Sequence, residues 1–369
     1  MMGAAPGAST LESSPMQTDG TDDMASAPTS APSPARSSRR VLPRIYLFEW
    51  VAALSLIAVV LFATTAPVGL AYGYLARRTL RKMALISLTS VACIVAAKAF
   101  AGMRSGAPFR SWLARSELAR AGFWTDLLRI IVSFSMVQTA HLTFKVYVPL
   151  INGVNYDELL RRCDRALFFD HDPIALVIAA CSSPLVLRAF DLIYSGAYFF
   201  LLWGGVALFF TQLDGAKRTT FFSSFVVMWQ LGLLFYLLLP SWGPVFTTPE
   251  LFESVLEHMP ATVWVQSHLH RETASIIRGN YDIVIHFFGL AAFPSLHVGV
   301  LVLYSLWAAQ LRRVWLHLAL CFLALIFIGS MLTGYHYLVD GLGGALVAGF
   351  SWVVARRLAG RSTAAAPTG

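Results

Sequence analysis

The two apolar runs that decide the fold open with Phe293-Pro294-Ser295-Leu296-His297 and with Tyr335-His336-Tyr337-Leu338-Val339-Asp340. Each run is interpreted as a membrane-spanning helix, and each has an ionisable residue near its start. Because polar groups at the edge of a bilayer are costly to bury, they usually mark function. Two histidines and a carboxylate at matching depth therefore predict acid–base or nucleophilic chemistry on a lipid-borne substrate.

The composition is that of a membrane protein. Of the 369 residues, 57% are hydrophobic and 13% are charged, whereas a soluble domain carries roughly 25% charged residues. The aromatic share of 13%, with ten Trp, fits helices that have interfacial belts. The formal charge of +8 does not indicate nucleic-acid binding, because the arginines cluster beside apolar runs, where they anchor and orient spans. We therefore predict that the protein is embedded in a lipid bilayer and that it does not bind nucleic acid.

Apolar runs of about 18 or more residues predict an all-α fold, a polytopic transmembrane helical bundle with about eight spans. The runs lie near residues 46–70, 83–101, 123–148, 184–211, 219–239, 294–311, 313–331 and 336–355. The third is the least apolar, since it contains Asp126, Arg129, Gln138, His141 and Lys145. Residues 1–40 are rich in Ser, Ala, Pro, Thr and Gly and predict a disordered tail. Residues 358–369 are expected to form a flexible C-terminal tail.

Two connections between the runs are expected to have structure of their own. Residues 157–168 have helical spacing with a charged face and predict a short amphipathic helix at the membrane surface. Residues 240–293 form the longest connection, and Trp242-Gly243-Pro244 predicts a turn that closes the fifth run.

The four cysteines give no sign of a metal site, because none forms a CxxC pair. Cys93 and Cys321 are expected to be small buried residues. Cys163 and Cys181 share one connecting region, which leaves a disulfide between them open.

Lys and Arg in short loops set the orientation of the spans. Most of them fall on one side when the runs are followed in order: Arg104, Arg110, Arg115, Arg120, Lys217, Arg218, Arg312, Arg313, Arg356, Arg357 and Arg361. That side is predicted to be cytoplasmic, and the cluster at residues 77–82 disagrees with it. If residues 294–355 cross three times, His297 and His336 lie at the same face. We predict that the protein lies in a bacterial inner (plasma) membrane and that these two histidines are at its outer face.

The spacing of the ionisable residues suits phosphoryl transfer. His336 and Asp340 are four residues apart, so on a helix they share a face, and the carboxylate can fix the imidazole tautomer. His297 is expected near a helix N-terminus with Pro294 in its first turn, a place that favours anions. One histidine would attack phosphorus, and the other would protonate the departing oxygen. No metal or cofactor is expected, because too few Asp and Glu lie nearby for a two-metal clamp.

These motifs resemble the type-2 phosphatidic acid phosphatase superfamily, and most closely its inositol phosphorylceramide synthase-like branch of phosphotransferases. The superfamily's second motif reads Pro-Ser-Gly-His, and Leu296 stands here in place of that Gly, as is common in the branch. The resemblance implies His336 as nucleophile, Asp340 as its partner and His297 as general acid. It also implies a six-helix core, here residues 123–357, to which residues 41–122 add an N-terminal pair of spans. Gly341, Gly343 and Gly344 are expected to allow close helix packing.

The sequence departs from the superfamily at the cations that hold phosphate. The first motif, a Lys followed by Arg-Pro, is absent before residue 294, and the third motif's Ser-Arg pair falls at Gly329 and Ser330. The substrate-binding candidates are four residues: Arg278, Ser295, Lys145 and Asp191. Arg278 could equally be a solvated loop residue, Lys145 a snorkelling interfacial residue, and Asp191, a candidate for binding a polyol head group, a partner of Arg188.

Three functions remain. The first is a lipid phosphotransferase that moves a phospho-head group between lipids, with phosphoinositol suggested by the resemblance alone. The second is a lipid phosphate phosphatase, which shares the first half-reaction. The third is a non-enzymatic transporter or scaffold, which predicts charges through the middle of several spans or an inverted repeat. Neither feature is found in the sequence, so we expect an enzyme whose substrate is a membrane lipid phosphate.

Overall fold

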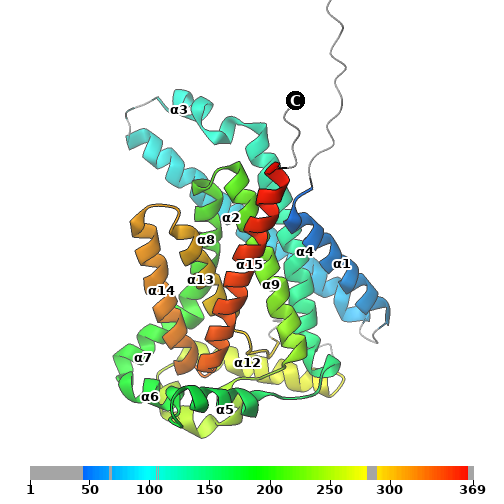
Figure 1. Ribbon diagram of the computed structural model, residues 1–369, viewed down its shortest axis with the longest axis vertical. Helices are drawn as coiled ribbons and strands as arrows, with labels where there is room; N and C mark the ends of the chain where they lie inside the picture. Colours follow the sequence, from blue (N-terminus) through cyan, green and yellow to red (C-terminus); the bar gives the residue numbers. More distant parts are fainter. Residues whose placement is uncertain (1–44, 66–68, 105, 107, 281–288, 365–369) are drawn as a thin grey trace, which may run out of the picture. The chain divides into compact units, whose positions relative to one another are not determined.

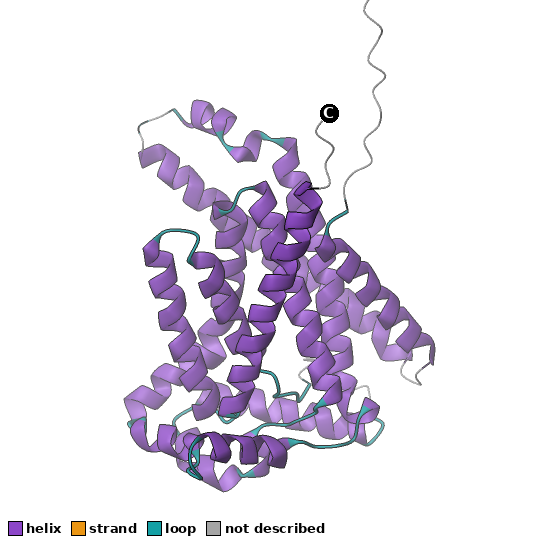
Figure 2. Ribbon diagram, viewed as in Figure 1, coloured by secondary structure: helices purple, strands orange, loops and turns teal. Residues whose placement is uncertain are grey.

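The computed structural model describes residues 45–65, 69–104, 106, 108–280 and 289–364. These residues form helices joined by short loops, and they contain no strand (Figure 2). The predicted N-terminal tail lies outside the described residues. Part of the predicted C-terminal tail was wrong, because residues 358–364 continue a helix that ends at Ala364; residues 365–369 lie outside the described residues.

Within the described ranges, the apolar helices follow the predicted runs. They are α1 (Leu47–Thr65), α2 (Gly69–Arg104), α4 (Ala121–Ile151), α7 (Pro184–Asp191) continued by η2 (Leu192–Ala197) and α8 (Tyr198–Gln212), α9 (Gly215–Leu238), α13 (Leu296–Ala308), α14 (Arg313–Leu332) and α15 (Leu338–Ala364). Among the residues described, six helices are long and apolar enough to cross a membrane, and the apolar helices at 47–62 and 296–308 are shorter. The chain is thus an integral membrane protein, and the predicted all-α polytopic bundle is confirmed.

The centre of the bundle is formed by α9, α13 and α15, which pack against one another (Figure 1). Helix α14 packs along α13, α4 along α9, and α1 along both α4 and α9. Helices α13 and α15 approach closely because Gly344 has no side chain: a Cβ there would lie 2.1 Å from the carbonyl oxygen of Ser295. The glycine prediction is confirmed at this position. The division of the chain at residue 122 stays a prediction.

The two ends of the bundle differ. Helices α5 (Asp157–Leu167), α6 (Pro173–Ala180) and α12 (Pro260–Ile277) lie across the lower end in Figure 1, with the short α10 (Pro244–Thr247), η3 (Pro249–Phe252) and α11 (Glu253–Leu256) in the same connection as α12. The upper end carries α3 (Phe109–Arg115), with η1 (Glu117–Ala119) following it, and the end of α15. The predicted helix at residues 157–168 is therefore present as α5. Which end faces the cytoplasm stays a prediction.

Two local predictions were wrong, and the disulfide that the sequence left open is absent from the described residues. The cluster at residues 77–82 was expected in a loop, but it lies within α2, which runs unbroken from Gly69 to Arg104. Cys93 and Cys321 are exposed on the outside of their helices, where a thiol can face lipid as a small apolar group. Cys163 and Cys181 are free thiols, so they form no disulfide.

Candidate active site

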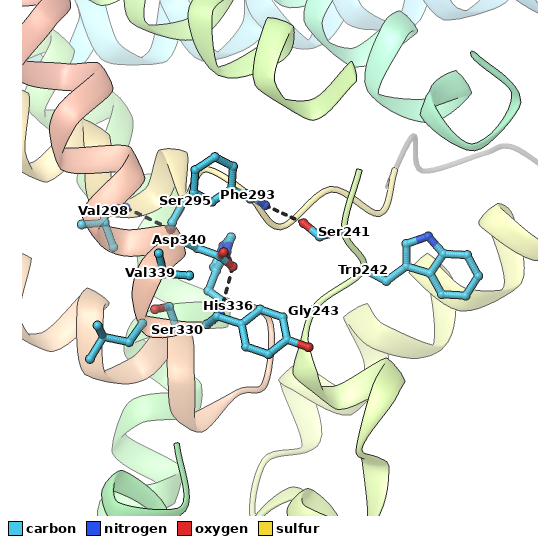
Figure 3. A network of polar contacts seen from close by, with 12 residues as sticks. Ser241, Trp242, Gly243, Phe293, Ser295, Val298, Ser330, His336, Val339 and Asp340 are labelled. Atoms are coloured by element: carbon cyan, nitrogen blue, oxygen red, sulfur yellow. Dashed lines mark hydrogen bonds and ion pairs between the residues drawn. The ribbon is translucent and has the colours of Figure 1, made fainter. Parts of the chain in front are cut away.

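The turn between α14 and α15 carries His336. The backbone N–H groups of Tyr335 and His336 both donate to the Ser330 carbonyl, each at 3.2 Å. Helix α15 begins only at Leu338, so His336 precedes the helix, and the prediction that it shares a helical face with Asp340 was wrong. The two side chains meet nevertheless, with His336 Nδ1 3.3 Å from Asp340 Oδ2 (Figure 3). The same carboxylate oxygen accepts the Tyr337 N–H at 2.9 Å, which folds the turn back onto α15.

The lead-in to α13 carries His297. Ser295 is the N-cap residue of α13, and its side chain accepts the Val298 N–H at 3.5 Å. Pro294 therefore lies before the cap and not in the first turn, which corrects its predicted place. The Ser295 N–H donates to the Asp340 carbonyl at 2.8 Å and ties the two motifs together. The rings of His297 and His336 are 5.6 Å apart between centroids, so the prediction that both lie at one face is confirmed.

A cavity of about 390 Å³ opens beside the two imidazoles. Both histidines line it, and the rest of its wall is largely aromatic: Tyr194, Tyr198, Phe199, Tyr236, Trp242, Trp264 and Tyr335. The His297 ring packs against Tyr198 at 4.3 Å and against Tyr194 at 5.1 Å between centroids. The Tyr194 hydroxyl is buried and has no hydrogen-bond partner among the residues described. It is therefore a free polar group at the wall of the cavity.

The aromatic wall depends on an irregular turn that sequence reasoning missed. Residues Leu192–Ala197 form a π-helical turn between α7 and α8. Such turns are rare and occur frequently at functional sites. This one lets Tyr194, Ser195 and Tyr198 all line the cavity. Only the aromatic residues within the span could have pointed to it in the sequence, and aromatic residues are common in spans.

Lys145 is the one Lys, Arg, Asp or Glu among the described residues that line the cavity. It reaches inward from α4, with its Nζ 5.4 Å from the centroid of the Tyr236 ring. Arg278 lies exposed just after the end of α12 and is not part of the wall. The structure therefore brings one of the two predicted cations to the histidines and leaves the other outside.

The other two substrate-binding candidates are engaged elsewhere. Ser295 is fully buried and caps α13. Asp191 is buried and accepts hydrogen bonds from the N–H groups of Ala261 and Thr262, at 2.9 and 2.7 Å, and from the Thr262 hydroxyl. These contacts hold the first turn of α12 and involve neither the cavity nor Arg188. Among the described residues, no group of three or more His, Cys, Asp or Glu could hold a metal ion.

The arrangement can carry out nucleophilic chemistry. A carboxylate beside one imidazole nitrogen fixes the tautomer and leaves the other nitrogen free to attack. A second imidazole in the same cavity can move a proton to or from the reacting oxygen. Lys145 supplies a positive charge in the same space.

Comparison with known proteins identifies a family. The profile described as the PAP2 superfamily matches residues 158–354, slightly more than half of the chain. The matched segment includes both histidines and Asp340, and it ends before the end of α15. No curated protein and no solved structure matched the chain.

Proposed function

Because the chain belongs to the PAP2 superfamily, we propose that it is a lipid phosphotransferase that acts through a phosphohistidine. Membership supports an action of this integral membrane protein on lipid phosphates within a bilayer. The observation that carries the proposal is the pair of imidazoles, 5.6 Å apart, with Asp340 beside one of them and a shared cavity in front.

In the first half-reaction, His336 attacks the phosphorus of the donor lipid. A nitrogen–phosphorus bond forms while the bond from phosphorus to the leaving oxygen breaks, and His297 gives that oxygen a proton. Asp340 keeps Nδ1 of His336 occupied, so that Nε2 carries out the attack. In the second half-reaction, His297 takes the proton from an acceptor hydroxyl, whose oxygen attacks phosphorus and releases His336.

Lys145 is proposed to bind the phosphate. It brings a positive charge to the wall that both histidines share, and hydrogen bonds between charged partners are roughly twice as strong as neutral ones. The unpartnered Tyr194 hydroxyl can donate to the same group. Arg278 is the weaker candidate because it lies outside the cavity.

An alcohol acceptor is favoured over water by the nature of the wall. Seven of the described residues that line the cavity are aromatic, and such a wall lowers the number of water molecules beside a reactive intermediate. A phosphatase with the same nucleophile is the second candidate, since it differs only in the attacking group. A transporter or scaffold gains no support, because the ionisable groups converge on one cavity. We place the site on the outer face of a bacterial inner (plasma) membrane.

The test uses purified protein and a panel of labelled lipid phosphates and phosphodiester lipids, with and without added inositol. Transfer of label to an acceptor supports a transferase, and release of the free phospho-group supports a phosphatase. His336→Asn should abolish both turnover and the labelled phosphoenzyme, whereas His297→Ala should still trap the label. Full turnover by His336→Ala would overturn the proposal, and trapping only in the His336 variant would reverse the two roles.

A further inference from the structure

Helix α5 lies across the end of the bundle that carries the site, outside the membrane-spanning helices (Figure 1). Its two aspartates, Asp157 and Asp164, are only 2% exposed. Their neighbours Glu158, Arg161 and Arg162 form ion pairs on the outer side. Residues seven apart lie on the same face of a helix. Helix α5 therefore directs two buried carboxylates at the bundle, and buried carboxylates need partners.

Asp164 binds the start of α15. Its Oδ2 accepts the Leu338 N–H at 2.8 Å, and its Oδ1 accepts the Val339 N–H at 2.8 Å. These N–H groups belong to the first turn of α15, where a helix has no partners of its own and favours negative charge. A cap of this kind normally comes from the residue before the helix. Here the cap comes from α5, a different helix. It fixes the backbone at Leu338, two residues after His336.

Asp157 binds the segment that follows α9. Its Oδ2 accepts the Trp242 N–H at 2.8 Å, and its Oδ1 accepts the Gly243 N–H at 2.9 Å. This segment in turn holds the lead-in to α13, because Ser241 accepts the Ala292 N–H with its carbonyl and the Phe293 N–H with its hydroxyl, each at 2.9 Å (Figure 3).

The two bound segments also touch each other. Gly243 has a φ of 99°, and a Cβ there would lie 2.5 Å from the Tyr335 carbonyl oxygen. The Val245 N–H donates to the Gly334 carbonyl at 2.9 Å. Helix α5 thus binds the end of the His336 turn directly, through Asp164. It binds the lead-in to His297 indirectly, through residues 241–243.

We propose that Asp157 and Asp164 are positioning residues, through which α5 sets the separation and orientation of the two imidazoles. A catalytic role for these imidazoles rests on the proposed function, whereas the hydrogen bonds from α5 to their two segments do not depend on it. Burial raises the pKa of Asp164 to about 6, the two N–H groups oppose the rise, and the nearby carboxylates of Asp340 and Asp172 add to it. The carboxylate that grips the turn is therefore present at neutral pH.

Asp172 provides a matched control. It lies on the same connection, and its Oδ1 accepts the N–H groups of Ile174 and Ala175 at 2.9 and 3.3 Å. It therefore caps its own helix α6 and touches neither histidine segment. An Asp→Asn change removes one of the two acceptor oxygens at Asp157 and Asp164, where each oxygen accepts a different N–H. At Asp172 one oxygen accepts both N–H groups, so Asp172→Asn can keep these bonds and controls for the loss of one negative charge on the same connection.

The experiment compares Asp164→Asn, Asp157→Asn and Asp172→Asn in the full-length protein. We expect Asp164→Asn to lower kcat at least tenfold with KM within twofold, because the His336 turn is displaced while the cavity residues on the other helices stay in place. Asp157→Asn should change KM as well, since Trp242 lines the cavity. Asp172→Asn should leave both constants within twofold. Asp164→Glu keeps the charge and both acceptor oxygens, so it should recover part of kcat.

A second readout does not depend on turnover. In protein labelled with ¹³C-histidine, the imidazole signal that disappears in His336→Asn should move in Asp164→Asn and stay in place in Asp172→Asn. Equal kcat in Asp164→Asn and Asp172→Asn, with an unmoved His336 signal, would overturn the positioning role. If the wild type turns over no lipid phosphate, the proposed function fails, while the His336 signal still decides whether α5 holds the turn.

Discussion

Lys145→Met is the substitution that best separates the two candidate cations. Methionine keeps an unbranched chain of similar length, so it fills the space beside the Tyr236 ring and removes only the charge. No ion pair to Lys145 is found among the described residues, so the change leaves no carboxylate unpaired there. Its effect should therefore fall on the substrate and not on folding.

The size of the effect follows from the kind of contact. A hydrogen bond to a charged group contributes about 1.5–3 kcal/mol, and about 1.4 kcal/mol corresponds to a tenfold change in rate. Loss of one Lys145–phosphate contact should therefore lower kcat/KM about 10- to 150-fold. Lys145→Arg keeps the charge and should retain most of the rate. Arg278→Met removes an exposed charge outside the cavity and should change kcat/KM less than about twofold.

The assay is steady-state transfer of a labelled head group in mixed micelles, with the thermal unfolding midpoint of each variant as the control for folding. Two results would refute the reasoning. One is an unchanged kcat/KM in Lys145→Met. The other is a larger loss in Arg278→Met than in Lys145→Met, which would move the phosphate towards the end of α12.

Three further predictions concern the packing and charge around the turn. Asp340→Asn should lower kcat by about 10³–10⁴-fold, as expected when the carboxylate that fixes a catalytic imidazole is lost; turnover within tenfold of wild type would remove this role. Gly344→Ala places a Cβ 2.1 Å from a backbone oxygen and should reduce the free energy of unfolding by at least about 1–3 kcal/mol, whereas Gly349→Ala on the same helix meets no atom within 4 Å and should not destabilise. With the folded pKa of Asp164 raised to about 6, its contribution to the free energy of unfolding should fall as pH rises from the ordinary Asp pKa to about 6. The ratio of wild-type to Asp164→Asn kcat should rise as pH passes through about 6, where the carboxylate forms in the folded protein; a ratio independent of pH would contradict this.

The helices and the pairing of the motifs could be predicted from the sequence. Long apolar runs have few alternatives to helices, because a bilayer offers no partners for unpaired backbone groups. The order of crossings then places His297 and His336 at one face, and the structure confirms this with rings 5.6 Å apart. This prediction depends only on the number of membrane crossings between the two histidines, so small errors in the predicted helix ends do not affect it.

The geometry of the turn could not be predicted from spacing. His336 and Asp340 are four apart, which suggests a shared helical face, yet His336 lies before the helix and meets Asp340 because the carboxylate also accepts the Tyr337 N–H. Likewise, nothing in the sequence around residue 194 shows that a π-helical turn interrupts the span there. Both features depend on packing against other elements, which local patterns do not contain.

The aspartates of α5 show where an interpretation based on helical faces breaks down. The charged side chains within 157–168 suggest one solvated face. In the structure some of them are at the surface and others are buried against the bundle. Glu158, with Arg161 and Arg162, pairs at the surface, whereas Asp157 and Asp164 are buried together with Leu160.

Burial of these two carboxylates is acceptable because four backbone N–H groups, from two distant segments, meet their oxygens. A buried polar group without such partners is strongly destabilising, so α5 cannot leave the bundle without exposing both carboxylates and the N–H groups they bind. The amphipathic helix is therefore anchored to the bundle through its acidic residues.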